Sequence, residues 1–284
     1  MIVNTADDDE FFGLHVSPDL DTIVYNLAGA APPARGWGLA GDGQRTLAAL
    51  RRFGCEPWFA LGDRDLATHL FRTGELRAGV PLHTVTGRIA RSFGVASRVL
   101  PMSNHPVRTW VHTRAGTALP FQVYFVRRHA RDAVERIAYR GIGAAVPAPG
   151  VIDAIRRARA IVLPPSNPFT SIRPILGVRG IEAALRRRRA PLVAVSPVSG
   201  GRAVRGPLGG MLRAYGFPVS PVGIVRVYRD LVDGIVIDHA DERHRLALEA
   251  LGVRVATTDV RMDTIPRSRA VAAVTLELAD ALAG

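Results

Sequence analysis

Polar residues that could bind a phosphorylated ligand follow a short apolar segment near the middle of this 284-residue sequence. The segment 160–163 is apolar, and the string after it, 164–172, reads PPSNPFTSI. Ser166, Asn167 and Ser171 supply hydroxyl and amide groups beside the free backbone N–H groups of a helix start, which suits a phosphate or a base. Ser171 also suits a plain helix N-cap, the commoner role of such a serine. The whole string, with more prolines and amides than one cap requires, favours a binding site.

A glycine pair follows the next apolar segment, 191–195, within the string SPVSGGRAVRGP. Gly200 and Gly201 would let the backbone approach a diphosphate closely, and the arginines that follow them could neutralise it. A double glycine alone is more often a turn than a site. Together with the first string, it predicts one extended nucleotide pocket. The residues predicted to bind the nucleotide are Ser166, Asn167, Ser171, Ser196, Gly200 and Gly201.

Aspartates with few cations near them in sequence gather in the first 65 residues. Carboxylate oxygens are preferred ligands of Mg²⁺, so this clustering predicts a magnesium site or a site for hydroxyl donors. For any single acid, such as Asp7 or Asp8, a solvated loop or a helix cap is the better interpretation. For Asp21 and Asp63 together, a site for Mg²⁺ or for a ligand with hydroxyl donors is the favoured interpretation. We expect these two to be the catalytic carboxylates and to hold the metal.

Several reaction classes are excluded by residue types that the sequence lacks. All 37 lysine-plus-arginine residues are arginine, so Schiff-base chemistry and Walker-type phosphate binding through lysine are excluded. The single cysteine, Cys55, excludes an internal disulfide and a cysteine-cluster zinc site. The histidines show no HxxxH spacing, which disfavours a zinc centre. Cationic help in catalysis must therefore come from arginine or a metal ion.

The net charge of +12 predicts an anionic partner. A nucleic-acid surface would also require interleaved aromatic residues or a recognisable binding module, and aromatics make up only 6% of the residues. We therefore expect a small anionic substrate such as a nucleotide, and no nucleic-acid partner. No apolar run approaches about 18 residues, and the acidic start MIVNTADDDE does not resemble a secretory signal. These features predict a cytoplasmic protein without a membrane partner.

The elements that would position these residues alternate between short apolar runs and helical stretches, which indicates an α/β fold. The predicted buried parallel strands are 160–163, 191–195 and 234–238. The predicted helices around them are 149–159, 172–188, 206–215, 240–251 and 267–282. This spacing fits a Rossmann-like three-layer sandwich with a mostly parallel sheet, in which ligands bind at the carboxyl ends of the strands.

The middle of the chain predicts a smaller region with helical and antiparallel elements. The predicted helices there are 43–53, 64–78 and 82–92, and the predicted strands are 98–113 and 119–126. Glycine, alanine and proline dominate 141–150, as in linkers between packed units. We therefore expect a core made of residues 1–40 and 145–284, with residues 41–144 as an inserted or capping region.

Six strings in a fixed order resemble a known family. The strings are NTADD, SPDLDT, GDRDLATH, LPMSNHPV, SNPxTSIxPIL and SPVSGGRAVRGP. They are similar to the 2-phospho-L-lactate transferase family (CofD-type), in the actinobacterial phosphoenolpyruvate transferase form, of deazaflavin coenzyme F-420 biosynthesis. The resemblance implies transfer of a phosphoenolpyruvyl or 2-phospholactyl group from a GDP-activated donor to the deazaflavin FO, with release of GMP. It also implies Mg²⁺ and a homodimer.

The resemblance assigns roles to particular residues. Asp21 in the SPDLDT string, with Thr22, would contact the deazaflavin, and the stretch from Ala60 to Arg64 would be a second contact. The SNP and SPxxGG strings would hold the guanosine nucleotide. A metal ion would bridge the diphosphate, while Asp21 or Asp63 positions or deprotonates the attacking hydroxyl.

Two departures from the family pattern qualify the resemblance. Family members carry a strand and a glycine-rich loop before the VNTADD string, whereas this chain starts at Met1, which predicts that roughly thirty residues of a strand, loop and helix unit are missing. Pro120 stands where the family tends to have a histidine before the Phe-Gln pair. An alternative function is therefore a catalytically impaired or regulatory homologue that binds guanosine nucleotides.

Overall fold

A parallel four-stranded sheet forms the centre of one half of the protein, in the order β13-β12-β9-β8. The computed structural model describes residues 1–33 and 35–284. The strands are β8 (Ile161–Leu163), β9 (Leu192–Val195), β12 (Gly234–Asp238) and β13 (Arg254–Thr258). The three strands expected from apolar runs are confirmed as parallel strands, but the predicted burial is wrong for the edge strand β8, where Val162 is 41% exposed. The sequence analysis missed β13, because this edge strand is only partly buried and has no continuous apolar run.

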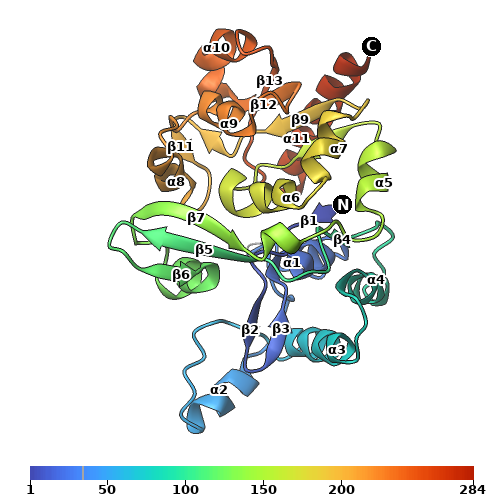
Figure 1. Ribbon diagram of the computed structural model, residues 1–284, viewed down its shortest axis with the longest axis vertical. Helices are drawn as coiled ribbons and strands as arrows, with labels where there is room; N and C mark the ends of the chain where they lie inside the picture. The colour runs from blue at the N-terminus through green and yellow to red at the C-terminus, as the bar shows by residue number, and fades with distance from the viewer. Residues whose placement is uncertain (34) are drawn as a thin grey trace.

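Helices cover both faces of this sheet. The strands follow one another in the order of the chain, and right-handed crossovers then place the connecting helices on one face. These helices are α6 (Arg173–Gly177), α7 (Ile181–Arg186), α8 (Leu208–Ala214), α9 (Pro221–Tyr228) and α10 (Arg245–Glu249), and α5 (Val151–Arg156) packs beside α7. The C-terminal helix α11 (Ile265–Ala283) packs against β9, β12 and β13 (Figure 1).

The side chains of β9 confirm the three-layer arrangement. Leu192 and Ala194 belong to the hydrophobic cluster that contains the connecting helices. Val193 and Val195 alternate with them and belong to a separate cluster with Val271 of α11. Because successive side chains of a strand point to opposite faces, the sheet is buried on both sides, as the continuous apolar run predicted.

The elements from β1 to β7 form the other half of the molecule (Figure 1), whereas the β10–β11 hairpin and η4 contact β12 of the parallel sheet or lie beside it. β1 (Ile2–Val3) pairs in parallel with β4 (Leu100–Pro101), and an antiparallel sheet has the order β6 (Ala118–Pro120), β5 (Arg108–Thr113), β7 (Val134–Arg140). Two hairpins are β2 (Asp9–Phe11) with β3 (Leu14–Val16) and β10 (Val198–Ser199) with β11 (Arg202–Ala203). The helices are α1 (Pro18–Leu27), α2 (Arg45–Arg52), α3 (Asp65–Arg77) and α4 (Leu82–Ser92). Two 3₁₀-helices, η2 (Ile142–Ala144) and η4 (His239–His244), and two π-helices, η1 (Val123–Arg127) and η3 (Pro168–Ile172), complete the described elements.

The N-terminal segment packs against the middle of the chain. Val3 and the α1 residues Leu20 and Val24 form one hydrophobic cluster with Val85 and Ile89 of α4. The division into a core of 1–40 plus 145–284 and an inserted region 41–144 stays a prediction. The described contacts join residues from both sides of that division in a shared core.

Four predicted elements differ from the observed ones. The strand expected over 98–113 is divided into β4, which pairs in parallel with β1, and β5, which belongs to the antiparallel sheet. The helix expected over 240–251 begins as the 3₁₀-helix η4 and continues as α10. The helix expected over 172–188 is broken between α6 and α7, where Gly180 adopts a φ of +96° that a helix cannot continue through. The strand expected over 119–126 ends at Pro120, which has no N–H for further pairing, and the chain continues as the π-helix η1.

No helix among the described residues is suited to crossing a membrane. The longest of them, α11, has 19 residues, and arginine, glutamate and aspartate interrupt its apolar positions.

Candidate functional site

A cavity of about 600 Å³ opens at the carboxyl ends of the parallel strands. This volume is ordinary for a small-molecule site. The loops after β8, β9 and β13 contribute Pro164 to Asn167, Pro197, and Val260 to Asp263 to its wall. The remaining lining residues are Asp7, Asp19, Phe121, Phe125, Thr170, Ser171, Val204, Arg205, Gly206, Pro207 and Leu208. The position agrees with the general placement of ligands in open α/β sheets.

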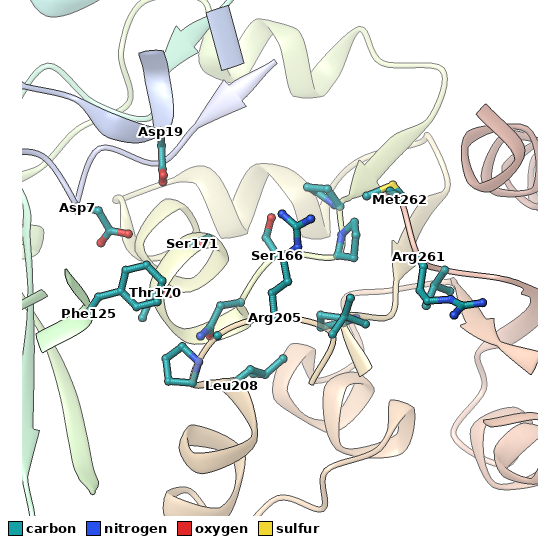
Figure 2. A pocket seen from close by; sticks show the side chains of 18 of the residues that line it. Asp7, Asp19, Phe125, Ser166, Thr170, Ser171, Arg205, Leu208, Arg261 and Met262 are labelled. Carbon is teal, nitrogen blue, oxygen red and sulfur yellow. The ribbon is translucent and has the colours of Figure 1, made fainter. Parts of the chain in front are cut away.

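Two aspartates from the N-terminal half enter this cavity (Figure 2). Asp7 lies between β1 and β2, and Asp19 lies in the first turn of α1. Asn4 connects Asp19 to the cavity wall, because its Nδ2 donates to Asp19 Oδ2 at 2.9 Å and to the carbonyl oxygen of Thr170 at 3.2 Å. The Nε2 of Gln122 donates to the Asp7 carbonyl oxygen at 2.8 Å, which fixes the backbone at that position.

Both carboxyl groups are held in an environment that disfavours their charge. Burial, followed by the negative charge of Asp19, raises the pKa of Asp7 well above its usual range. Burial raises the pKa of Asp19 to about 6, and the nearby Asp8 adds to the shift. Asp7 Oδ1 and Asp8 Oδ1 are buried without a hydrogen-bond donor. Paired carboxylates with unused oxygens fit a hard divalent cation, which would relieve their repulsion.

The raised pKa of Asp19 predicts how stability depends on pH and magnesium. The pKa of Asp19 is about 6 in the folded protein and 3.8 in the unfolded chain. Asp19 therefore stabilises the folded state below pH 4, and this contribution is lost as the pH rises through 6. The loss lowers the free energy of unfolding by up to about 3 kcal/mol. Mg²⁺ should therefore raise the unfolding temperature strongly at pH 7.5 and little at pH 4.5. Thermal unfolding with and without Mg²⁺, compared between wild type and Asp19→Asn, measures this. An equal magnesium effect at both pH values would contradict it.

Arginines and hydroxyl groups occupy the rest of the cavity wall. Figure 2 shows Arg205 together with Ser166 in the middle of the cavity and Arg261 at the end away from Asp7. No carboxylate of the described residues forms an ion pair with Arg205, whereas Arg261 pairs with Asp259 at 2.8 Å. A free guanidinium beside serine hydroxyls is suited to binding a phosphate group.

The first predicted string lies at this cavity. Ser166, Asn167 and Ser171 all line its wall. Asn167 also acts as the N-cap of η3, because its Oδ1 accepts a hydrogen bond from the N–H of Phe169 at 2.9 Å. Their role in nucleotide binding stays a prediction, with the geometry in its favour.

Three residues of the second predicted string lie away from the cavity wall. Ser196 is fully buried, and its hydroxyl is bonded to the backbone of Val198. Gly200 and Gly201 form the turn of the β10–β11 hairpin with φ of +56° and +77°. The N–H of Gly200 donates to Asp241 at 3.1 Å, so this donor is already used. None of the three is among the cavity-lining residues.

Asp21 lies in a buried ionic network between α1 and α3. The guanidinium of Arg72 donates hydrogen bonds to both carboxylate oxygens of Asp21, and Arg72 Nη1 also lies 3.2 Å from His69 Nδ1. His69 Nε2 lies 3.3 Å from Asp65, and Asp21, Asp65 and His69 place potential metal ligands within 4.8 Å of one another. However, the Arg72 guanidinium already neutralises Asp21, so this group fits a metal ion less well than Asp7 and Asp19 do.

Asp63 has a different set of partners. Its two oxygens accept hydrogen bonds from the N–H groups of Arg45 and Thr46 at the start of α2, and these bonds lower its pKa. The N–H of Arg64 in turn donates to Asp42 at 2.8 Å. Asp63, Arg64, Ala60 and Thr22 are not among the cavity-lining residues. The catalytic, metal and deazaflavin roles of Asp21 and Asp63, and the deazaflavin contacts of Ala60, Arg64 and Thr22, stay predictions.

Asp7, Asp19, Phe121 and Phe125 are among the cavity residues that the sequence does not identify. Asp7 lies in an acidic run that suits a solvated loop, and Asp19 lies two residues before Asp21 on α1. Phe121 and Phe125 fall within the strand expected over 119–126. A usable signal for Asp19 is the Ser-Pro-Asp start of α1, because a proline in the first turn marks a helix start and places Asp19 in that turn.

The family can be decided by comparison with known sequences. A sequence profile described as 2-phospho-L-lactate transferase CofD matches residues 1–278. The chain belongs to this family. The phosphoenolpyruvate transferase of Kitasatospora aureofaciens is 41% identical over 285 residues, which cover 99% of this chain and 89% of that protein. The 2-phospho-L-lactate transferase of Methanosarcina acetivorans is 36% identical over 280 residues, which cover 99% of this chain and 90% of that protein. The resemblance of the six strings to the CofD family is thus confirmed.

A solved structure supports the fold of this CofD family member. A crystal structure of a UPF0052 family protein from Bacillus halodurans superposes with a TM-score of 0.58 over 91% of this chain and 83% of that one. The two sequences are only 17% identical, so this likeness concerns the fold alone.

Proposed function

We propose that this CofD family protein transfers a phosphoenolpyruvyl or 2-phospholactyl group from a GDP-activated donor to the deazaflavin FO in coenzyme F-420 biosynthesis. The family match over residues 1–278 carries the proposal. A ribityl hydroxyl oxygen of FO attacks the phosphorus that bears the three-carbon unit. A new P–O bond forms there, the bridging P–O bond of the diphosphate breaks, and GMP leaves with the bonding electrons.

The carboxylates of Asp7 and Asp19 are the proposed cation site. The unused Oδ1 of Asp7 and the repulsion between Asp7 and Asp19 fit Mg²⁺, which would supply charge stabilisation to the diphosphate when bound. A carboxylate oxygen of Asp7 or Asp19 that is not bound to the cation would accept the proton of the attacking hydroxyl. Asn4 orients Asp19 through its 2.9 Å hydrogen bond. Asp21 and Asp63 remain the alternative carboxylates that the sequence predicts.

The nucleotide half of the donor is proposed to lie along the carboxyl ends of the strands. Ser166, Asn167 and Ser171 offer hydrogen-bonding groups there, and Arg205 offers an unpaired positive charge. A guanidinium at this position would bind the phosphate of the departing GMP and stabilise the charge that develops on it.

A turnover assay with FO, Mg²⁺ and each GDP-linked donor tests the proposed function. We expect GMP release and a deazaflavin product whose mass identifies the three-carbon unit, since relatives with both transferase names are similar to this chain. Omission of Mg²⁺ should abolish the release. GDP binding without turnover for either donor would instead favour the regulatory nucleotide-binding alternative.

We also propose a cytoplasmic homodimer, as the family resemblance implies. Sedimentation or light scattering of the purified protein should give about twice the chain mass of 30.6 kDa. A mass of one chain at assay concentrations would contradict the dimer without affecting the proposed reaction.

A further inference from the structure

The hydrogen-bond register of η3 is interrupted where the chain continues into α6. The N–H of Arg173 donates to the carbonyl oxygen of Pro168, five residues before it, as in a π-helix. The next residue, Pro174, has no N–H, so it cannot donate to Phe169 at the same spacing or to Thr170 at the α-helical spacing of four. Phe169 and Thr170 are buried, and a buried carbonyl without a donor costs free energy. Both carbonyl groups therefore gain from donors outside the helix.

Side chains from the other half of the molecule supply these donors. The hydroxyl of Tyr139, on β7, donates to the carbonyl oxygen of Phe169. Asn4 Nδ2 donates to the carbonyl oxygen of Thr170 at 3.2 Å. Burial raises the pKa of Tyr139 above its usual value, so the hydroxyl stays protonated and remains a donor at neutral and mildly alkaline pH. Two adjacent hydrogen bonds thus hold η3 to the N-terminal half.

The Tyr139 hydrogen bond lies on a short path from η3 to Asp7. Tyr139 pairs with Thr109 of the neighbouring strand β5. The N–H of Thr109 donates at 2.7 Å to the carbonyl oxygen of Ala6, the residue directly before Asp7. At the other end of the path, η3 supplies Thr170 and Ser171 to the cavity wall. The antiparallel sheet therefore connects the acidic end of the cavity to the wall that η3 forms.

The ring of Phe169 is held by a second tyrosine, independently of this hydrogen bond. Phe169 is fully buried and stacks on Tyr215, with ring centroids 4.7 Å apart and an interplanar angle of 11°. The hydroxyl of Tyr215 accepts a hydrogen bond at 2.7 Å from the N–H of Ile137, also on β7. The two tyrosine hydroxyls thus both bond in this region, but that of Tyr139 bonds η3 and that of Tyr215 bonds β7.

We propose that Tyr139 is a positioning residue of the transfer reaction, whose hydroxyl fixes η3 at the separation from Asp7 that the reaction requires. This assignment rests on the proposed function and adds a residue that is not among those lining the cavity. A misplacement of about 1 Å between reacting groups can lower a rate about 100-fold although the ligands still bind. Loss of the Tyr139 hydroxyl therefore lowers kcat more than it weakens ligand binding.

Steady-state kinetics of Tyr139→Phe, which loses only the hydroxyl, test this role. We expect kcat for GMP release to fall about 10- to 100-fold, while KM for the donor and Kd for GDP change less than about threefold. Tyr215→Phe is the matched control, because it also loses a hydrogen-bonded hydroxyl and keeps its ring against Phe169. Each variant should lower the unfolding temperature by about 2–4 °C, but Tyr215→Phe should keep kcat near that of wild type.

The outcomes separate the positioning role from the proposed function. Wild-type kcat in Tyr139→Phe would overturn the positioning role and leave the transferase proposal intact. An equal fall of kcat in both variants would also overturn it, because a general loosening around β7 would then be the cause. Wild-type protein that binds GDP but releases no GMP from either donor would overturn the proposed function and the positioning role together.

Discussion

Replacing Asp19 by asparagine is expected to lower turnover about 100- to 1,000-fold while making the magnesium-free protein more stable above pH 6. The amide keeps the shape of the side chain and its position beside Asn4, but it removes one of two carboxylates that face each other in the cavity. In the magnesium-free protein, the variant lacks the repulsion between the carboxylates of Asp7 and Asp19. Because one carboxylate ligand is lost, the affinity for Mg²⁺ also falls. Steady-state GMP release over a magnesium titration measures the first effect, and thermal unfolding at pH 7.5 measures the second.

The matched control for this variant is Glu10→Gln, which removes an exposed acid from β2 with the same change in net charge. Its turnover and unfolding temperature should stay close to those of wild type. If Asp19→Asn retained wild-type turnover and magnesium dependence, the cation site would have to be sought elsewhere, and the group formed by Asp21, Asp65 and His69 would become the leading candidate.

Replacing Arg72 by methionine should be the most destabilising single change, at about 3–5 kcal/mol of the free energy of unfolding. Arg72 is 1% exposed and bonds both oxygens of the buried Asp21, which would be left without a counter-charge. His69 would lose its contact with the same guanidinium. Urea unfolding at pH 7 measures the loss.

A double variant distinguishes a structural from a catalytic role of Asp21. Arg72→Met combined with Asp21→Leu removes both charges, so most of the lost stability should return. If the pair only joins α1 to α3, the folded double variant should also regain turnover. A double variant with recovered stability but no turnover would support the catalytic role that the sequence predicts for Asp21.

The sequence by itself determined the features that depend on local pattern. Continuous apolar runs identified β8, β9 and β12. The reason is clearest for β9, which is covered on both faces and needs apolar side chains at every position. The ordered strings identified the family, and the string after β8 located Ser166, Asn167 and Ser171 at a strand end where ligands bind. Such features follow from residues that are neighbours in the chain.

Only the tertiary structure decided which acids face the cavity. Asp19 and Asp21 are two residues apart on α1, about 200° around the helix axis, so they point in nearly opposite directions. Which of them faces the cavity depends on how α1 is rotated, and that is set by Arg72 of α3 on one side and by Asn4 and Thr170 on the other. Likewise, Phe121 and Phe125 became a wall of the cavity because Pro120 ended strand pairing and the chain turned into η1. The rotation of α1 depends on Arg72, which is 51 residues from Asp21, and on Thr170, which is 166 residues from Asn4, and no local pattern records such partners.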